Sequence, residues 1–174
     1  NDDMLRAILP QTALDSIANT GVCEARYYDG VAIFYSDFVG FTKIASGIPP
    51  RQLMDTLGEL FDQFDSIMTK NKCERIDVIG DAYLAVAGLD GGVDVVNRIA
   101  RAALDIIDYL TERNRRQRSL GAPEFIARIG LHVGSIVGGM VGGERLRYAI
   151  FGDAVNTAQR LEAGGEPGEI TVSE

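Results

Sequence analysis

The sequence is short of cysteine and has no long apolar run. Its two cysteines, Cys23 and Cys73, lack the spacing of metal ligands, which is typical of reduced thiols in a cytosolic compartment. No apolar run reaches the roughly 18 residues that cross a membrane, and no signal peptide opens the chain. We therefore expect a cytoplasmic domain, either on its own or as the cytosolic part of a membrane or soluble receptor.

Basic residues are scarce relative to acidic ones. Lysine and arginine number 17 against 25 aspartates and glutamates, so the net charge is -8. This charge argues against nucleic acid or an anionic membrane as a partner, and a polyanionic substrate would need metal ions and a few local arginines. The chain has 174 residues, 46% of them hydrophobic, which is enough to bury one core. We expect one globular domain.

Two aspartates stand where apolar β-runs break. Asp37 lies in Phe34-Tyr-Ser-Asp-Phe-Val-Gly-Phe-Thr42, and Asp81 lies in Ile79-Gly-Asp-Ala-Tyr83. Two carboxylates at one rim of a sheet leave coordination positions for water and phosphate oxygens, as when Mg²⁺ is held with a nucleoside triphosphate. The backbone amides after the first aspartate precede a helix and are candidates to bind phosphate; they belong to Phe38, Val39, Gly40, Phe41 and Thr42. The pattern predicts an enzyme that acts on nucleotides.

Hydrophobic periodicity predicts a mixed α/β (α+β) fold with a ferredoxin-like βαββαβ core and a C-terminal extension. The expected elements are a strand at 31–35, a helix at 51–70, a hairpin of strands 73–78 and 82–87, a helix at 93–113 and a strand at 125–133. A lead-in helix that ends at Gly21 precedes this core, a polar loop spans 114–123, and the extension carries a helix near 153–162. In this layout Gly80-Asp81 closes the hairpin beside the first strand, so both aspartates project from one edge.

Four segments resemble the catalytic domain of the class III nucleotidyl cyclases, the adenylyl and guanylyl cyclases. They are the two aspartate segments, Ala127-Arg-Ile-Gly-Leu-His-Val-Gly134, and Phe151-Gly-Asp-Ala-Val-Asn-Thr-Ala-Gln-Arg-Leu-Glu162. The resemblance covers roughly residues 5 to 174, and it implies a lead-in at 1–21 followed by a catalytic domain at 22–174. The family's closing hairpin, which carries a phosphate-binding lysine, lies beyond the last residue, so we expect a truncated C-terminal end.

The resemblance also implies a role for each matching residue. Asp37 and Asp81 match the ligands of two Mg²⁺ or Mn²⁺ ions, and Arg128 matches an arginine that contacts phosphate. Asn156 and Arg160, one helical turn apart, match the asparagine that orients the ribose and the arginine that stabilises the transition state. In the family the aspartates and the asparagine–arginine pair come from different subunits. We therefore expect a homodimer, inert as a monomer, that converts a purine nucleoside triphosphate to the 3′,5′-cyclic monophosphate and pyrophosphate downstream of a sensor domain.

Two positions select the base in this family. The first, four residues before Asp81, is usually lysine in adenylyl and glutamate in guanylyl cyclases, and here it is Asp77. The second follows Tyr148; it is usually aspartate or threonine for adenine and cysteine or another small residue for guanine, and here it is Ala149. A carboxylate can accept from guanine N1–H and its 2-amino group, whereas adenine N1 is itself an acceptor. We expect a slight preference for GTP, with ATP as the alternative.

Two other functions fit parts of the sequence. A diguanylate cyclase shares the fold, but the hairpin reads Ile-Gly-Asp-Ala where that family has Gly-Gly-acidic-acidic-Phe. A degenerate cyclase-like module, which binds nucleotide or dimerises without turnover, is favoured by the unusual base positions and opposed by the intact aspartates, asparagine and arginine. The only histidine, His132, is expected to be a satisfied core residue, and 114–118 is expected to be a solvated loop.

Overall fold

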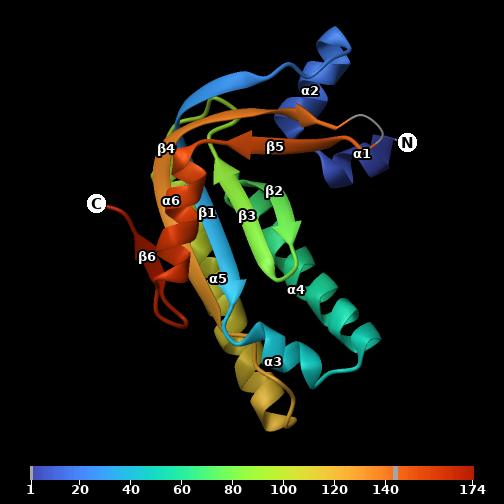
Figure 1. Ribbon diagram of the computed structural model, residues 1–174, viewed down its shortest axis with the longest axis vertical. Helices are drawn as coiled ribbons and strands as arrows, with labels where there is room; N and C mark the ends of the chain where they lie inside the picture. The colour runs from blue at the N-terminus through green and yellow to red at the C-terminus, as the bar shows by residue number, and fades with distance from the viewer. Residues whose placement is uncertain (1, 143–144) are drawn as a thin grey trace.

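One curved sheet with helices on both faces organises the computed structural model, which describes residues 2–142 and 145–174 (Figure 1). The elements in chain order are α1 (Asp2–Ile8), α2 (Gln11–Thr20), β1 (Arg26–Phe38), α3 (Phe41–Ser46), α4 (Pro50–Lys70), β2 (Glu74–Ile79), β3 (Ala82–Ala87), α5 (Val95–Ser119), β4 (Ala127–Val141), β5 (Arg147–Phe151), α6 (Asp153–Ala163) and β6 (Ile170–Val172). None of the helices in these ranges has a stretch long and apolar enough to span a membrane.

The strand order is β2-β3-β1-β4-β5, and β1 pairs antiparallel with both β3 and β4. The predicted ferredoxin-like α+β core is confirmed. Because β4 is long, it pairs with two further strands along its other edge. β6 pairs parallel with its first part, and β5 pairs antiparallel with its last part. In this register Ser36 lies opposite Tyr83, and Asp37 lies opposite Arg128. The end of β1 therefore meets both the hairpin and β4.

β1 and β4 are much longer than the predicted strands. β1 has 13 residues and β4 has 15, where the sequence predicts strands only at 31–35 and 125–133. The β1–β4 register shifts between Tyr28 and Val31, around Gly30, whose φ of 68° is a left-handed conformation that suits glycine at a bulge. Beyond this bend the sheet curls, so that β2 and β5 touch although they stand at opposite ends of the strand order.

Each face of the sheet has its own core. Successive residues of a strand point to opposite faces, so Phe34 packs with α4 and α5 while Ile33 packs with α2 and α6. On the first face, Phe34 and Phe64 pack edge to face against Tyr83, and the ring centroids of Phe64 and Tyr83 lie 5.3 Å apart. Figure 1 shows α5 behind the sheet and α6 in front of it. From Val31 to Phe34, β1 is buried on both faces, which explains the apolar run there.

Two sequence predictions about the helices are wrong. The second long helix does not end at residue 113: α5 continues to Ser119, so the predicted loop begins six residues too early. Asn114 is buried rather than solvated, and its side chain donates to Phe125 O at 2.8 Å and accepts from Phe125 N at 2.9 Å. The lead-in is two helices, not one, because Pro10 at their junction has no amide hydrogen with which to continue α1.

Candidate active site

The end of β1 and the β2–β3 turn bring Asp37 and Asp81 to one edge of the sheet (Figure 1). The amide of Phe38, the residue directly after Asp37, donates to Asp81 Oδ2 at 3.0 Å. The turn that carries Asp81 is tight because Gly80 has a φ of 61°, a left-handed conformation. The sequence prediction that these two carboxylates share an edge is therefore met by the backbone geometry.

The turn at 38–42 has fewer available amides than the sequence suggests. The amide of Phe38 is bonded to the carboxylate just described, and Val39 N donates to Ile126 O at 2.8 Å. Gly40, with a φ of 63°, redirects the chain into α3. The last two residues of the turn begin this helix, where the first amides have no acceptor within the helix. They are the amides of this turn best placed to meet a phosphate.

Arg128 binds the first aspartate instead of facing solvent. It lies opposite Asp37 on β4, and its Nε and Nη2 donate to Asp37 Oδ1 and Oδ2 at 3.1 and 2.9 Å. Its Nη1 donates to Ala163 O at 3.1 Å, at the end of α6. The hydrogen bond to Asp37 raises the pKa of the Arg128 guanidinium above its ordinary value. Within one chain, the candidate phosphate ligand thus holds a candidate metal ligand.

Glu162 is a third carboxyl group at this site, and the sequence predictions do not include it. Its side chain is only 3% exposed, and Oε1 lies 3.3 Å from Arg128 Nε in an ion pair without hydrogen-bond geometry. Burial raises the pKa of the Glu162 carboxyl to about 8, and a hydrogen bond with Asp37 and the charges of Asp37 and Asp81 add to the rise. Three acidic groups around one guanidinium make this edge a favourable place for a cation.

A signal for Glu162 is present in the sequence of α6. The buried residues of this helix are Ala154, Ala158 and Glu162, spaced by four, so an acid occupies the third place of a stripe whose first two members are alanines. The stripe lies on glycines of β4. A Cβ at Gly130 would lie 2.2 Å from Ala158 O, and one at Gly134 would lie 2.6 Å from the Ala154 Cβ. The helix backbone therefore touches the strand, which buries Glu162 beside the arginine.

Asn156 and Arg160 lie on a different face of the same helix. Each is two residues from Ala158, about 200° around the axis, and both are exposed. Arg160 Nη2 donates to Thr157 Oγ1 at 3.3 Å, and neither side chain has a hydrogen bond or ion pair to the two aspartates among the described residues. One chain therefore does not bring the four predicted catalytic and metal-binding side chains together.

The predicted base-selecting residues lie where the sheet curls. Asp77 Oδ2 on β2 forms an ion pair with Arg147 Nη1 on β5 at 3.0 Å, which joins the two ends of the strand order. Arg147 and Ala149 are two residues apart on β5, so they share a face of that strand. Sequence reasoning missed Arg147, although its place two residues before a candidate base position was an available signal. His132, expected in the core, is only half-buried, with Nδ1 2.6 Å from Ser173 Oγ.

The donor set at the sheet edge suits a hard divalent cation. Within 2–142 and 145–174, no group of three histidine, cysteine, aspartate or glutamate side chains is arranged to enclose a metal ion. Asp37 and Asp81 offer carboxylate oxygens, the ligands that Mg²⁺ and Mn²⁺ prefer, and a pair of them leaves positions for water and phosphate. Beside them, burial of the Glu162 carboxyl, together with the nearby Asp37 and Asp81, raises its pKa although Arg128 lies next to it.

Comparisons with known proteins agree on one family. The sequence model described as "Adenylate and Guanylate cyclase catalytic domain" matches residues 23–174. The chain is 39% identical to the receptor-type guanylate cyclase gcy-13 of Caenorhabditis elegans over 99% of this chain and 17% of that protein. It is 36% identical to the atrial natriuretic peptide receptor 2 of Homo sapiens over 98% of this chain and 16% of that protein. The chain thus spans less than a fifth of these relatives.

Solved structures give the same result. The guanylate cyclase domain of RhGC from Catenaria anguillulae, in complex with GTP, superposes with a TM-score of 0.79 at 33% identity, covering 85% of this chain and 80% of that one. A rhodopsin-guanylyl cyclase core with converted specificity, in complex with ATPαS, has the same TM-score at 34% identity, covering 86% and 80%. This chain belongs to the adenylate and guanylate cyclase catalytic-domain family, the class III nucleotidyl cyclases.

Proposed function

We propose that this chain converts GTP, in preference to ATP, into the 3′,5′-cyclic monophosphate and pyrophosphate. The observation that carries the proposal is the convergence of Asp37 and Asp81 at one sheet edge beside Arg128 in a chain of the cyclase family. This arrangement provides oxygen ligands for divalent cations and a guanidinium for phosphate within one small volume. A degenerate module without turnover would not need to keep all three.

Asp37 and Asp81 are the residues that would hold two Mg²⁺ or Mn²⁺ ions. Asp81 Oδ1 makes no hydrogen bond within the described part of the chain, whereas both oxygens of Asp37 accept from Arg128. When bound, such ions lower the pKa of the attacking ribose hydroxyl and offset the charge of the triphosphate. Asp37 would hold a cation more readily if Arg128 moved its donors to another acceptor.

The chain's own residues bind and orient the triphosphate. Arg128 turns its donors from Asp37 to phosphate oxygens, together with the first amides of α3. Arg160 offsets the negative charge that grows at the α-phosphate, and Asn156 orients the ribose. Because Asn156 and Arg160 face away from the aspartates of their own chain, they act in the site of a second copy. The active species is a homodimer in which two chains contribute to each site.

Two observations favour GTP over ATP. Guanine presents N1–H and a 2-amino group, which Asp77 can accept, and it presents O6 as an acceptor for the paired Arg147. The relatives gcy-13 and the RhGC domain are guanylate cyclases by name. The ion pair keeps the short Asp77 side chain in place, which compensates in part for its being one methylene shorter than glutamate.

The catalytic domain works on the cytosolic side of a longer protein that carries a sensor. The gcy-13 relative is a receptor-type cyclase, and the chain spans only a small part of it. The lead-in at 1–21 is the segment through which a signal would enter. It is tied to the core because Arg75 Nη2 donates to Ala7 O at 3.1 Å and Gln11 N donates to Glu74 Oε1 at 2.8 Å.

The decisive experiment measures cyclic nucleotide formation from GTP and from ATP, with Mg²⁺ or Mn²⁺, for single variants and for their mixture. Asp37→Ala and Arg160→Ala should each lose at least about 10²-fold in turnover, because each removes one half of a shared site. Mixed in equal amounts, they should recover about a quarter of wild-type activity, since half of the dimers are mixed and each keeps one intact site.

The outcomes separate the parts of the proposal. A folded Asp37→Ala protein with wild-type turnover would refute the metal assignment. A mixture that stays inactive after subunit exchange has been demonstrated would refute the shared site. A wild-type protein with no product from either nucleotide would leave the degenerate module as the better description.

A further inference from the structure

Arg128 competes with any cation for Asp37. Its Nε and Nη2 occupy one side of both carboxylate oxygens, at 3.1 and 2.9 Å. A divalent ion at the same carboxylate meets a guanidinium whose positive charge repels it. Metal binding at Asp37 is therefore easier when the arginine moves away from this carboxylate, and the free-energy cost of that movement depends on which other acceptors can hold the arginine.

The last turn of α6 offers Arg128 a second set of acceptors. Glu162 Oε1 lies 3.3 Å from Nε, and Ala163 O accepts from Nη1 at 3.1 Å. The Glu162 carboxyl group is held in place beside the arginine, because its side chain is 3% exposed and Gly130 lets the helix backbone lie directly on β4. The Asp37 side chain, at 24% exposed, is open to incoming ligands. One aspartate is thus accessible to a cation while the glutamate stays behind the arginine.

We propose that Glu162 is a positioning residue that holds Arg128 at the site when a divalent cation takes Asp37. The inference rests on the proposed cyclase function, because it assumes that Asp37 is a metal ligand. With Glu162 present, Arg128 exchanges one carboxyl partner for another and stays beside the incoming triphosphate. Without an acceptor at residue 162, Asp37 is the only carboxyl partner left to Arg128 beside the carbonyl of Ala163, so the arginine opposes the metal more strongly and is aimed less well at phosphate.

The test compares two variants of equal length. Glu162→Met fills the same buried space without an acceptor, whereas Glu162→Gln keeps an oxygen within reach of Arg128 Nε. We expect Glu162→Met to weaken Mn²⁺ binding to the nucleotide-free protein, measured by electron paramagnetic resonance, by roughly 10-fold, the effect of one charge-assisted contact. The KM for nucleotide should rise by a similar factor, with a smaller change in kcat, and Glu162→Gln should restore most of both.

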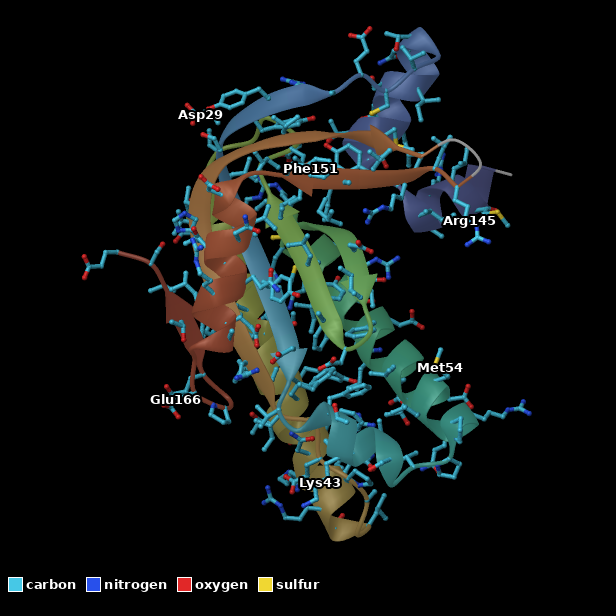
Figure 2. All side chains as sticks on the ribbon, viewed as in Figure 1. Asp29, Lys43, Met54, Arg145, Phe151 and Glu166 are labelled. Carbon is cyan, nitrogen blue, oxygen red and sulfur yellow. The ribbon has the colours of Figure 1, made fainter. Side chains whose placement is uncertain are left out.

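Glu166→Ala is the control for a lost glutamate near α6, because Glu166 is exposed at the outer tip of the loop before β6 (Figure 2). It should bind Mn²⁺ as wild type does. The second test is a double-mutant cycle with Arg128→Ala. If Glu162 acts through the arginine, Glu162→Met should change Mn²⁺ affinity no further once Arg128 is gone.

Three results would overturn the inference while the cyclase assignment stands. They are an unchanged Mn²⁺ affinity in Glu162→Met, an equal loss with and without Arg128, and a Glu162→Gln variant as impaired as Glu162→Met. Failure of the proposed function looks different. In that case wild type forms no cyclic nucleotide, and Asp37→Ala leaves Mn²⁺ binding unchanged.

Discussion

Adding one methyl group at Gly130 should destabilise the protein, whereas adding one at Gly58 should stabilise it. A Cβ at Gly130 would lie 2.2 Å from Ala158 O and 2.6 Å from Glu162 N, and both of these atoms are helix backbone. Ordinary contact begins near 3.4 Å, so α6 would have to retreat by about 1 Å. Gly58 lies on the exposed side of α4, and a Cβ there would meet nothing within 4 Å.

The expected magnitudes follow from these distances. Overpacking costs about 1–3 kcal/mol, and Gly130→Ala should reach the upper end because a backbone carbonyl cannot rotate away as a side chain can. Gly58→Ala should add roughly 0.5–1 kcal/mol by removing the flexibility of glycine from a helix interior. At about 2–4 °C per kcal/mol for a domain of this size, the melting temperature should fall by about 6–12 °C for Gly130→Ala and rise slightly for Gly58→Ala.

Thermal unfolding followed by circular dichroism, with urea unfolding as a check on the m-value, measures both variants. Gly130→Ala should also lose cyclase activity at temperatures where it is still folded, because a displaced α6 moves Glu162 away from Arg128. Gly58→Ala should keep wild-type activity, since α4 contributes none of the candidate site residues. A Gly130→Ala protein that melts at or above the wild-type temperature would refute direct contact between helix and strand.

Three further outcomes are expected. Asn114→Ala should lower the free energy of unfolding in urea by about 2–4 kcal/mol, because the buried amide and carbonyl of Phe125 lose their partners. The folded-state pKa of Glu162, about 8, exceeds its ordinary value of 4.5, so the contribution of this carboxyl group to stability should be fully present below about pH 4.5 and decline towards pH 8 in the metal-free protein. Urea unfolding with a chelator, repeated across this pH range, should show the decline in wild type and not in Glu162→Gln. Asp77→Lys with Ala149→Asp should raise the ATP:GTP ratio of kcat/KM by roughly 10 to 10³, and an unchanged ratio would contradict the base assignment.

Local patterns were sufficient to predict the centre of the fold. A period of 3.6 residues predicts a helix at 51–70, and α4 spans Pro50–Lys70. The turn Gly80-Asp81 closes the predicted hairpin, because glycine takes the left-handed conformation that a short connection needs. Such features depend on neighbours a few residues away, so the amino-acid order contains the information to predict them.

The end of α5 could not be predicted in this way. Residues 114–118 are polar and basic, a composition that fits both an exposed helical turn and a loop. Two hydrogen bonds between Asn114 and the backbone of Phe125 decide in favour of the helix, and these residues are 11 positions apart. The pairing depends on how α5 docks against the start of β4.

By itself, the sequence determined that Asp37 and Asp81 meet at one edge, since both aspartates stand at the ends of apolar strands joined in a simple order, but it did not show that Glu162 joins them. Only the tertiary structure decided how these groups are partnered. The energy of a charged side chain depends on burial and on charges brought from other elements, and neither is visible in local order. The contact of α6 with β4 at Gly130 puts Glu162 behind Arg128, and the helical rotation within α6 turns Asn156 away from the same aspartates.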